Sequence, residues 1–246
     1  MDPTLTDEGN WEGHPTAGTT VPAFVDWILG AIVALFGLLA IVGGSALAFL
    51  VDRDVLAEGI EDEVVTVTVG TTELTEAEQL EVADAIVSWI GTGLLLTGLG
   101  MVVFAIGFVV ARHRAHGRSR QDEPVRSYGT FALLGAFATT VLSFIPFSPA
   151  LGGALAGYLE RGESERTVSV GTLAGLLPLI PVLAIIASVL VGLVSGMLAI
   201  GQPGAAIAVG TAMFFALMLI ATLGAVLGAL GGYLGGKFAE HRASAD

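Results

Sequence analysis

Five long apolar runs constrain the fold of this chain more than any other feature. At about 1.5 Å per helical residue, each run is long enough to cross the ~30 Å hydrocarbon core of a bilayer. We therefore predict an all-α integral membrane protein, a bundle of about six membrane segments in three hairpins. The runs cover residues 24–51, 85–111, 128–159, 168–200 and 205–236.

Charged side chains are missing from these runs. They contain no Lys, Arg, His or Glu, and their only carboxylates, Asp26 and Asp84, lie at or just outside the end of a run. Charges inside a membrane usually mark proton relays, ion pathways and substrate sites. The sequence therefore predicts an architecture but names no substrate.

The charge balance of the chain is strongly acidic. Twenty-three Asp and Glu residues oppose ten basic ones, for a net charge of −13, and Lys237 is the only lysine. Carboxylates keep a surface hydrated, and arginine is hydrated more weakly than lysine. We interpret this balance as typical of a haloarchaeon, with a GC-rich genome as the competing explanation of the arginine bias. The negative surface argues against nucleic acid as a partner.

Motifs for catalysis or metal binding are absent from the sequence. With no cysteine, disulfides, thiol nucleophiles and thiolate metal sites are excluded. His113 and His116 are three residues apart but lack carboxylate support, so we interpret them as solvated. No catalytic triad, phosphate-binding loop, dinucleotide or zinc-protease pattern occurs. We predict no enzyme activity, no cofactor and no metal.

The arginines set the predicted orientation. Segment 112–127 holds five arginines against two acids, which favours the cytoplasmic side. Segment 52–84 carries eleven acids and only Arg53, so we place it outside as a small acidic cap. Both termini are then cytoplasmic, in a multi-pass protein of the cell membrane.

The third run is ambiguous in this topology. Pro146 and Pro149 interrupt it, and proline removes a backbone donor and disturbs helix geometry. We favour a hairpin with one arm over 128–145 and a return arm over 149–160. The return arm, at ~18 Å, is too short to span and needs shielding by neighbouring helices. A single broken span stays open as the alternative.

Aromatic residues near the ends of the runs agree with the hairpin topology. Trp and Tyr gather at the two membrane–water interfaces. The topology places Trp89 at the outer interface and four others at the inner interface, although large side chains near helix ends are common in any bundle. The four inner interface anchors are Trp27, Tyr128, Tyr158 and Tyr233.

The outer segment has two local signals. Residues 63–69 alternate β-branched side chains before Gly70, which predicts a short strand and turn. Thr75 and Glu78 fit a capping box, which predicts a helix from about Glu76 into the second span.

These boundaries divide the chain into five parts. They are an acidic cytoplasmic tail (1–22), an N-terminal transmembrane hairpin (23–111), a basic cytoplasmic loop (112–127), a Gly-rich transmembrane domain of two hairpins (128–236) and a cytoplasmic tail (237–246).

Two pairs of short segments are similar to each other within the Gly-rich domain. Segment 154–159 matches 229–234, and 127–132 is similar to 169–174, which indicates either two related hairpins or chance in a Gly-Ala-Leu-rich sequence. The stretch 129–236, with LSFIPFSPALGG at 142–153 and then GYLE, resembles a small haloarchaeal membrane family of unknown function. The N-terminal hairpin resembles uncharacterised segments sometimes labelled permeases. Neither resemblance implies functional residues.

Glycines at every fourth position form a stripe on the last run, a pattern known as a glycine zipper. Small residues at this spacing let helix backbones approach closely, which is the main attraction between helices in lipid. The stripe predicts an intimate contact, either inside the bundle or between copies of the protein. Its members are Gly224, Gly228, Gly232 and Gly236, with a weaker pair at Gly153 and Gly157.

A second Pro-x-x-Pro pair, Pro178 and Pro181, lies about ten residues into the fourth run. Interruptions at corresponding positions of two halves indicate a transporter's central site. Here the positions do not correspond, so we favour a structural kink over a binding site. Hydroxyls of the third run, such as Thr139, Thr140 and Ser143, either line a water path or bond to their own backbone.

The leading functional hypothesis is a non-enzymatic membrane protein that acts by helix packing and association. Its expected partners are the bilayer and a second copy or another membrane protein, with the Gly224 to Gly236 face as the contact. The alternative is a small permease or channel for a weakly charged solute, which would use the proline kinks and hydroxyls.

Overall fold

The computed structural model describes residues 23–62, 74–118, 128–160 and 164–243. All regular structure in these ranges is α-helical. Four helices are long and apolar enough to cross a membrane. They are α1 (Ala23–Leu50), α3 (Glu76–Arg118), α7 (Leu179–Ala199) and α8 (Pro203–Ala243). For the described residues, this confirms the all-α class and the membrane-spanning character.

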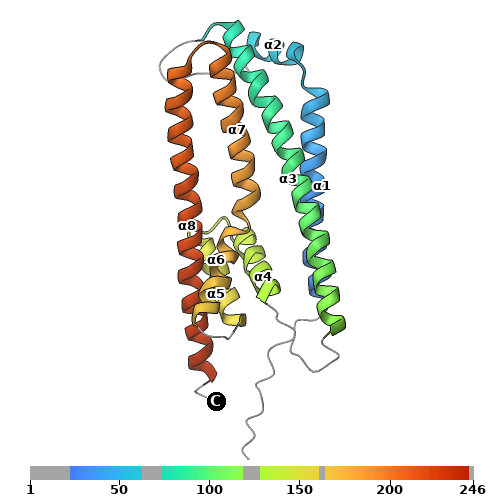
Figure 1. The fold of residues 1–246 in the computed structure, drawn as a ribbon, viewed down its shortest axis with the longest axis vertical. Coiled ribbons are helices and arrows are strands. Elements are labelled where there is room, and N and C mark those ends of the chain that lie inside the picture. The colour runs from blue at the N-terminus through green and yellow to red at the C-terminus, as the bar shows by residue number, and fades with distance from the viewer. Residues whose placement is uncertain (1–22, 63–73, 119–127, 161–163, 244–246) are drawn as a thin grey trace, which may run out of the picture.

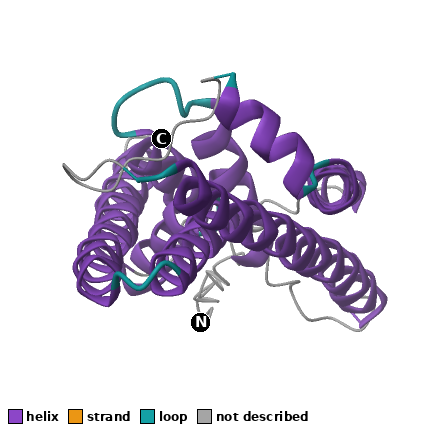
Figure 2. Cartoon of the chain, turned by 90° about the horizontal axis from the view of Figure 1, so that it is seen from above, coloured by secondary structure: helices purple, strands orange, loops and turns teal. Residues whose placement is uncertain are grey.

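Four shorter helices complete the fold, namely α2 (Arg53–Glu61), α4 (Tyr128–Val141), α5 (Ser148–Glu160) and α6 (Ser164–Leu176). Figure 1 shows α4, α5 and α6 gathered in the half of the bundle that holds the C-terminal end of α8, while α2 lies at the opposite end. In the view along the bundle, the helices form one connected group (Figure 2). The half with α4, α5 and α6 contains a core of Phe131, Ala132, Ala156, Val170 and Ala174.

The predicted capping box is present at the start of α3. The Thr75 hydroxyl donates to the Glu78 carboxylate at 2.8 Å, and the Thr75 backbone N–H donates to the same carboxylate oxygen at 2.9 Å. The helix then runs unbroken into the second apolar run, as predicted. The predicted strand at 63–69 lies outside the described residues.

Helix α2 was not predicted. Asp52 caps it by accepting a hydrogen bond from the Val55 N–H at 3.0 Å. Its buried residues, Leu56 and Ile60, anchor it to the bundle. Arg53 donates to Glu81 of α3 at 2.7 Å, and this hydrogen bond raises the pKa of the Arg53 guanidinium.

Two long helices extend beyond the apolar runs. The expected basic loop 112–127 begins as helix, because α3 continues to Arg118, and the expected tail 237–246 is helical to Ala243. Adding a residue to an existing helix gains a backbone hydrogen bond without a new nucleation cost, so polar residues extend a helix beyond its apolar part. The acidic tail 1–22 lies outside the described residues.

The third run reverses direction, as the hairpin prediction required. Helices α4 and α5 pack side by side, and the chain turns between them over residues 142–147. Phe147, at the end of the turn, has a positive φ of 68°, which is costly for a residue with a side chain. At ~21 Å and ~20 Å, neither helix alone matches the ~30 Å hydrocarbon core.

The fourth run is broken at the predicted proline. Helix α6 ends at Leu176 and α7 begins at Leu179, so Pro178 lies between them. Since proline has no N–H, the carbonyl oxygen of Ala174 loses its helical donor. The Thr139 hydroxyl of α4 lies 3.4 Å from this oxygen. The single hydroxyl proton of Thr139 is shared with the closer Gly135 carbonyl at 3.0 Å, so α4 supports the break only in part.

Candidate functional site

The predicted glycine stripe of α8 faces α6 within the same chain. All four of its glycines are buried. A Cβ on Gly228 would overlap the carbonyl oxygen of Gly171, and a Cβ on Gly232 would lie 2.9 Å from the Gly171 Cα. A Cβ on Gly236 would lie 2.9 Å from the Thr167 hydroxyl oxygen. The two helices are therefore in backbone-to-backbone contact.

Helix α5 packs beside α6 on the same stretch of α8. A Cβ on Gly153 would lie 3.0 Å from the Gly228 Cα, and one on Gly157 would lie 2.8 Å from the Gly232 Cα. The structure thus brings together the two predicted glycine groups. With α5 and α6 in place, the stripe is covered and is not a free face for a second copy.

A second row of small residues on α8 escaped the sequence analysis. Gly231 and Gly235 are buried against α5, where added Cβ atoms would overlap the carbonyl oxygens of Ala150 and Ala154. The same four-residue spacing continues to the buried Ala239. This four-residue spacing is present in the sequence directly beside the longer stripe, and it was the available signal.

Helices α1 and α3 form another glycine contact that sequence reasoning missed. A Cβ on Gly37 would lie 2.8 Å from the Gly98 carbonyl oxygen, and one on Gly44 would lie 2.7 Å from the Gly91 carbonyl oxygen. The contacting glycines are spaced by seven residues on both helices. A seven-residue repeat keeps one seam facing a partner along two helices, so this spacing was the available signal.

The membrane hydroxyls bond mainly to their own helices. Thr140 donates to the Ala136 carbonyl at 3.0 Å, Thr172 to Val168 at 2.9 Å and Ser188 to Ala184 at 2.9 Å. Thr139 likewise donates to Gly135 at 3.0 Å. This is the commoner of the two arrangements considered for these side chains. A hydroxyl occupied by its own backbone has less capacity to bind a solute.

Asp26 has a different environment from the one expected of an interfacial carboxylate. Only 3% of the residue is exposed, and it accepts a hydrogen bond from the fully buried Thr130 hydroxyl at 2.8 Å. The contact joins the first turn of α1 to the first turn of α4. It therefore links the N-terminal hairpin to the Gly-rich half of the chain.

We expect Thr130→Val to lower the free energy of unfolding by about 1–3 kcal/mol, because it removes a donor to a buried carboxylate while nearly keeping the side-chain shape. Thr130→Ser keeps the hydroxyl and should cost less. Chemical or thermal unfolding of the purified protein in detergent compares the variants. Equal losses for valine and serine would show that the hydroxyl contributes nothing.

The turn between α4 and α5 lies deep along the bundle. Because Thr130 contacts Asp26, α4 starts level with α1, and residue 142 lies 12 residues, or ~18 Å, further along. This is almost halfway along α1, which is ~42 Å long. Figure 1 shows the upper ends of α4 and α5 near the middle of the long helices. Phe144 and Phe147 are 79% and 67% exposed there.

The other predicted residues occupy separate places. Pro146 lies in this turn, Pro149 in the first turn of α5 and Pro181 in the first turn of α7, where proline is tolerated. The helix segments that carry the four predicted inner aromatic anchors lie in the same half of the bundle. Three of the anchors are within four residues of a helix end, whereas Tyr233 lies ten residues before the end of α8. The four anchors are Trp27, Tyr128, Tyr158 and Tyr233.

Trp89, the predicted outer interface anchor, lies 13 residues into α3, near the start of the second apolar run, and packs beside Gly192 of α7.

Candidate metal ligands do not gather in the described part of the chain, where no group of three His, Asp or Glu side chains has the geometry to hold an ion. His113 is exposed near the end of α3, and the His116 side chain lies outside the described residues.

Residues 129–238 match the family described as "Family of unknown function (DUF5518)". The matched range agrees closely with the predicted resemblance over 129–236. No curated protein and no solved structure matches the chain. The haloarchaeal source stays a prediction from composition.

Proposed function

We propose that the chain is a non-enzymatic membrane protein that acts by associating with a second copy of itself through the α4–α5 turn. In this proposal α4 and α5 enter the membrane as a short hairpin beside the four long helices, for six membrane segments in all. Both chain ends face the cytoplasm, and the acidic segment around α2 forms an outer cap.

The observation that carries the proposal is the exposure of the turn. Residues 143–147 are all exposed, although they lie almost halfway along α1. Several amides of the turn bond locally, such as the Ile145 N–H to the Leu142 carbonyl at 2.8 Å. Any polar group of irregular backbone that is not satisfied in this way finds no partner in hydrocarbon. Such backbone is tolerated where protein covers it or where it lines a water-filled cavity. A covering protein is therefore one of two physical solutions.

The turn replaces the glycine stripe as the proposed contact, because α5 and α6 already cover the stripe. Its exposed side chains are largely apolar, with Phe144, Ile145 and Phe147 around Pro146. A second copy presents the same surface, so a two-fold arrangement would bury both turns at once. Such a contact would hide the irregular backbone of both copies from lipid.

The alternative proposal is a small permease or channel, and the same observation favours it. If water fills a crevice at the turn, the irregular backbone is solvated and no protein cover is needed. The own-helix bonding of Thr140 and Thr172 weakens this alternative, since these hydroxyls are already occupied. The two proposals differ in whether water reaches the turn.

Because the chain contains no cysteine, Ser143→Cys provides a single reporter at the turn. In purified protein reconstituted in liposomes, we expect copper phenanthroline, which enters the bilayer and lets oxygen oxidise two adjacent thiols, to join two copies through a disulfide. A membrane-impermeant maleimide should leave the same cysteine unlabelled, because the turn of the partner excludes water. Gel electrophoresis and mass spectrometry measure both reactions.

Leu219→Cys is the matched control, since Leu219 is an apolar side chain near the middle of α8 that is 60% exposed. It should give neither dimer nor label. Labelling of Ser143→Cys by the impermeant reagent would overturn association and favour the permease. Absence of both label and dimer would also overturn association through this turn.

A further inference from the structure

The N-terminal hairpin, made of α1, α2 and α3, meets the other helices at two places. In the described residues, α3 packs against α7, and α1 meets α4 near the first turn of both helices. No other helix among α4 to α8 approaches the backbone of the hairpin within this part of the chain. Helix α7 lies in the half of the bundle that holds α2, whereas the α1–α4 contact lies at the opposite end (Figure 1).

The contact at the α2 end is a buried core. A Cβ on Gly196 of α7 would lie 2.8 Å from the Val82 Cα of α3, so the two backbones touch. Val82 and Met197 are 0% and 1% exposed. They form one apolar cluster with Leu74 and with Ala206 of α8. This cluster joins α3, α7 and the start of α8 firmly.

The contact at the opposite end is of another kind. Asp26 of α1 accepts a hydrogen bond from the Thr130 hydroxyl of α4 at 2.8 Å. Beside it, a Cβ on Gly129 would lie 3.9 Å from the ring of Phe108 in α3. One polar contact and the edge of one ring thus join the hairpin to α4, where the α2 end has a core of four buried side chains.

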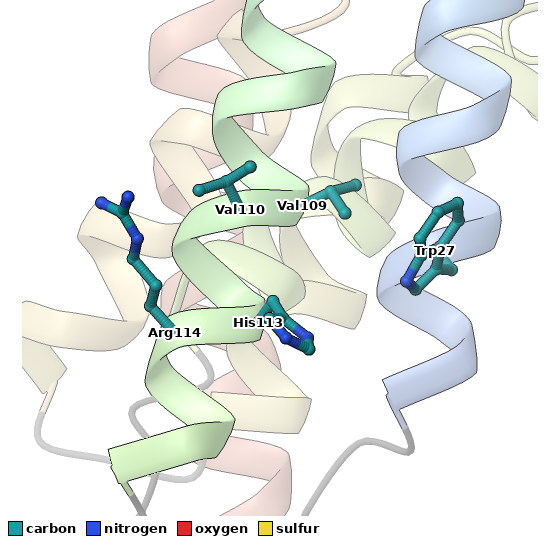
Figure 3. Close-up of a pocket in the computed structure, with 5 residues that line it drawn as sticks. All are labelled: Trp27, Val109, Val110, His113 and Arg114. Carbon is teal, nitrogen blue, oxygen red and sulfur yellow. The ribbon is translucent and has the colours of Figure 1, made fainter.

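Figure 3 shows the groove between α1 and α3 at this end. Val109 and His113 of α3 are directed toward Trp27 of α1, and the described residues that line the groove all belong to these two helices. The hairpin therefore keeps a surface of its own here, which α4, α5, α6 and α8 do not cover.

Helix α7 is separated by a break from both of its neighbours in the chain. Pro178 lies between α6 and α7, and Gly201, with a φ of 73°, lies between α7 and α8. A short non-helical connection absorbs a change of direction that a continuous helix would resist. Helix α7 can therefore stay packed on α3 while its angle to α6 and α8 changes.

We propose that the N-terminal hairpin, together with α7, rotates about the buried cluster at the α2 end and separates from α4 at the opposite end. In this proposal the Asp26–Thr130 hydrogen bond holds the closed state. Elements joined by few buried contacts open at a lower free energy than a packed core does. The motion is independent of the α4–α5 turn and of the proposed association.

A small rotation is enough, because the cluster and the hydrogen bond lie far apart. Val109 packs beside Gly30 near the start of α1. From Val82 in the cluster to Val109, α3 rises ~40 Å, so a separation of ~5 Å needs a rotation of only ~7°.

Spin labels on two cysteine pairs measure the separation, since the chain has no native cysteine. The first pair, at Phe24 and Leu234, joins α1 and α8 near the end that opens. The second pair, at Leu50 and Ile207, joins the same two helices at the α2 end. All four side chains are exposed. Double electron–electron resonance in liposomes, with excess unlabelled protein to suppress distances between copies, gives the distances within each pair.

We expect Thr130→Val to raise the ratio of long to short distances for the Phe24 and Leu234 pair at least about tenfold, the change expected for one buried hydrogen bond. The distances between Leu50 and Ile207 should stay as in the wild type, because the cluster is intact. Thr130→Ser is the matched control, since it keeps the hydroxyl, and it should resemble the wild type for both pairs.

Two results would overturn the proposal. One is a Thr130→Val variant with wild-type distances between Phe24 and Leu234. The other is equal broadening for both pairs, because the whole bundle would then be loosened without a pivot.

A second variant tests the same contact from α1 in case Thr130→Val does not fold. Asp26→Asn nearly keeps the side-chain shape but replaces the carboxylate by an amide, which is a weaker acceptor. It should also lengthen the distances between Phe24 and Leu234. A folded Asp26→Asn variant with wild-type distances would contradict the role of this hydrogen bond.

Discussion

Replacing Gly228 and Gly232 together by leucine should unfold the Gly-rich half of the protein or leave it only marginally folded. At both positions an added Cβ already meets the backbone of α6, at Gly171 and Thr167. Backbone atoms cannot move aside as the end of a flexible side chain can. Overpacking typically costs about 1–3 kcal/mol at one site, so two sites on one contact approach the total stability of a small domain. Thermal unfolding in detergent measures the loss.

The matched control is the same double change at Gly100 and Gly107 of α3. Added Cβ atoms at these two glycines meet nothing within 4 Å. Leucine also favours helix over glycine by several tenths of a kcal/mol, so the control should be neutral or slightly more stable. If the α8 and α3 double variants unfold at the same temperature, close packing of α8 against α6 is not what stabilises this half.

Gly44→Ala should destabilise the α1–α3 hairpin, whereas Gly43→Ala, one residue earlier, should not. A Cβ on Gly44 would lie 2.7 Å from the Gly91 carbonyl oxygen and 2.9 Å from the Leu95 nitrogen. A Cβ on Gly43 would meet nothing within 4 Å. We expect a loss of about 1–3 kcal/mol at Gly44 from overpacking. At Gly43 we expect up to ~1 kcal/mol of stabilisation from helix propensity.

This pair is a sensitive test because the two variants have the same composition and lie in the same helix turn. Opposite shifts of the unfolding midpoint would assign the effect to contact with α3. Shifts of the same sign and size would mean that helix propensity alone decides, and that the seven-residue glycine seam adds nothing measurable. The Gly44→Leu and Gly43→Leu variants should enlarge the contrast.

Contacts of this kind matter more in a membrane than in water. Helices in lipid gain little from hiding apolar side chains, since the surrounding lipid is equally apolar. Close approach of backbones then supplies much of the attraction. The described part of the chain uses it between α1 and α3, between α3 and α7 through Gly192 and Gly196, between α4 and α5 through Gly135 and Gly152, and between α8 and both α5 and α6.

The apolar runs by themselves determined the helical class and located the four helices long enough to cross a membrane, but they predicted about six segments, and the run over 128–159 is divided between the shorter helices α4 and α5. They located the long helices because a helix surrounded by lipid must be apolar and long enough to cross the hydrocarbon core, and both properties can be seen in a single run. Local signals were equally informative where the partner lies nearby in sequence. The Thr75–Glu78 capping box and the breaks near Pro146 and Pro178 depend on backbone geometry within a few residues. The capping box and the Pro178 break appear where the sequence indicated, whereas α4 ends at Val141, four residues before the predicted end of its arm.

Only the tertiary structure decided what the glycine stripe contacts. A glycine stripe on one helix indicates that another helix packs closely against it. That helix is α6, whose Gly171 lies about 60 residues before the stripe, and the glycine spacing along α8 does not indicate which helix it contacts. For the same reason the sequence did not predict that Asp26 is buried and hydrogen-bonded, since its partner Thr130 is 104 residues away. Long-range pairing depends on which helices the connecting turns place side by side. Which helices lie side by side depends on the packing of the whole bundle, and no single segment of the sequence determines it.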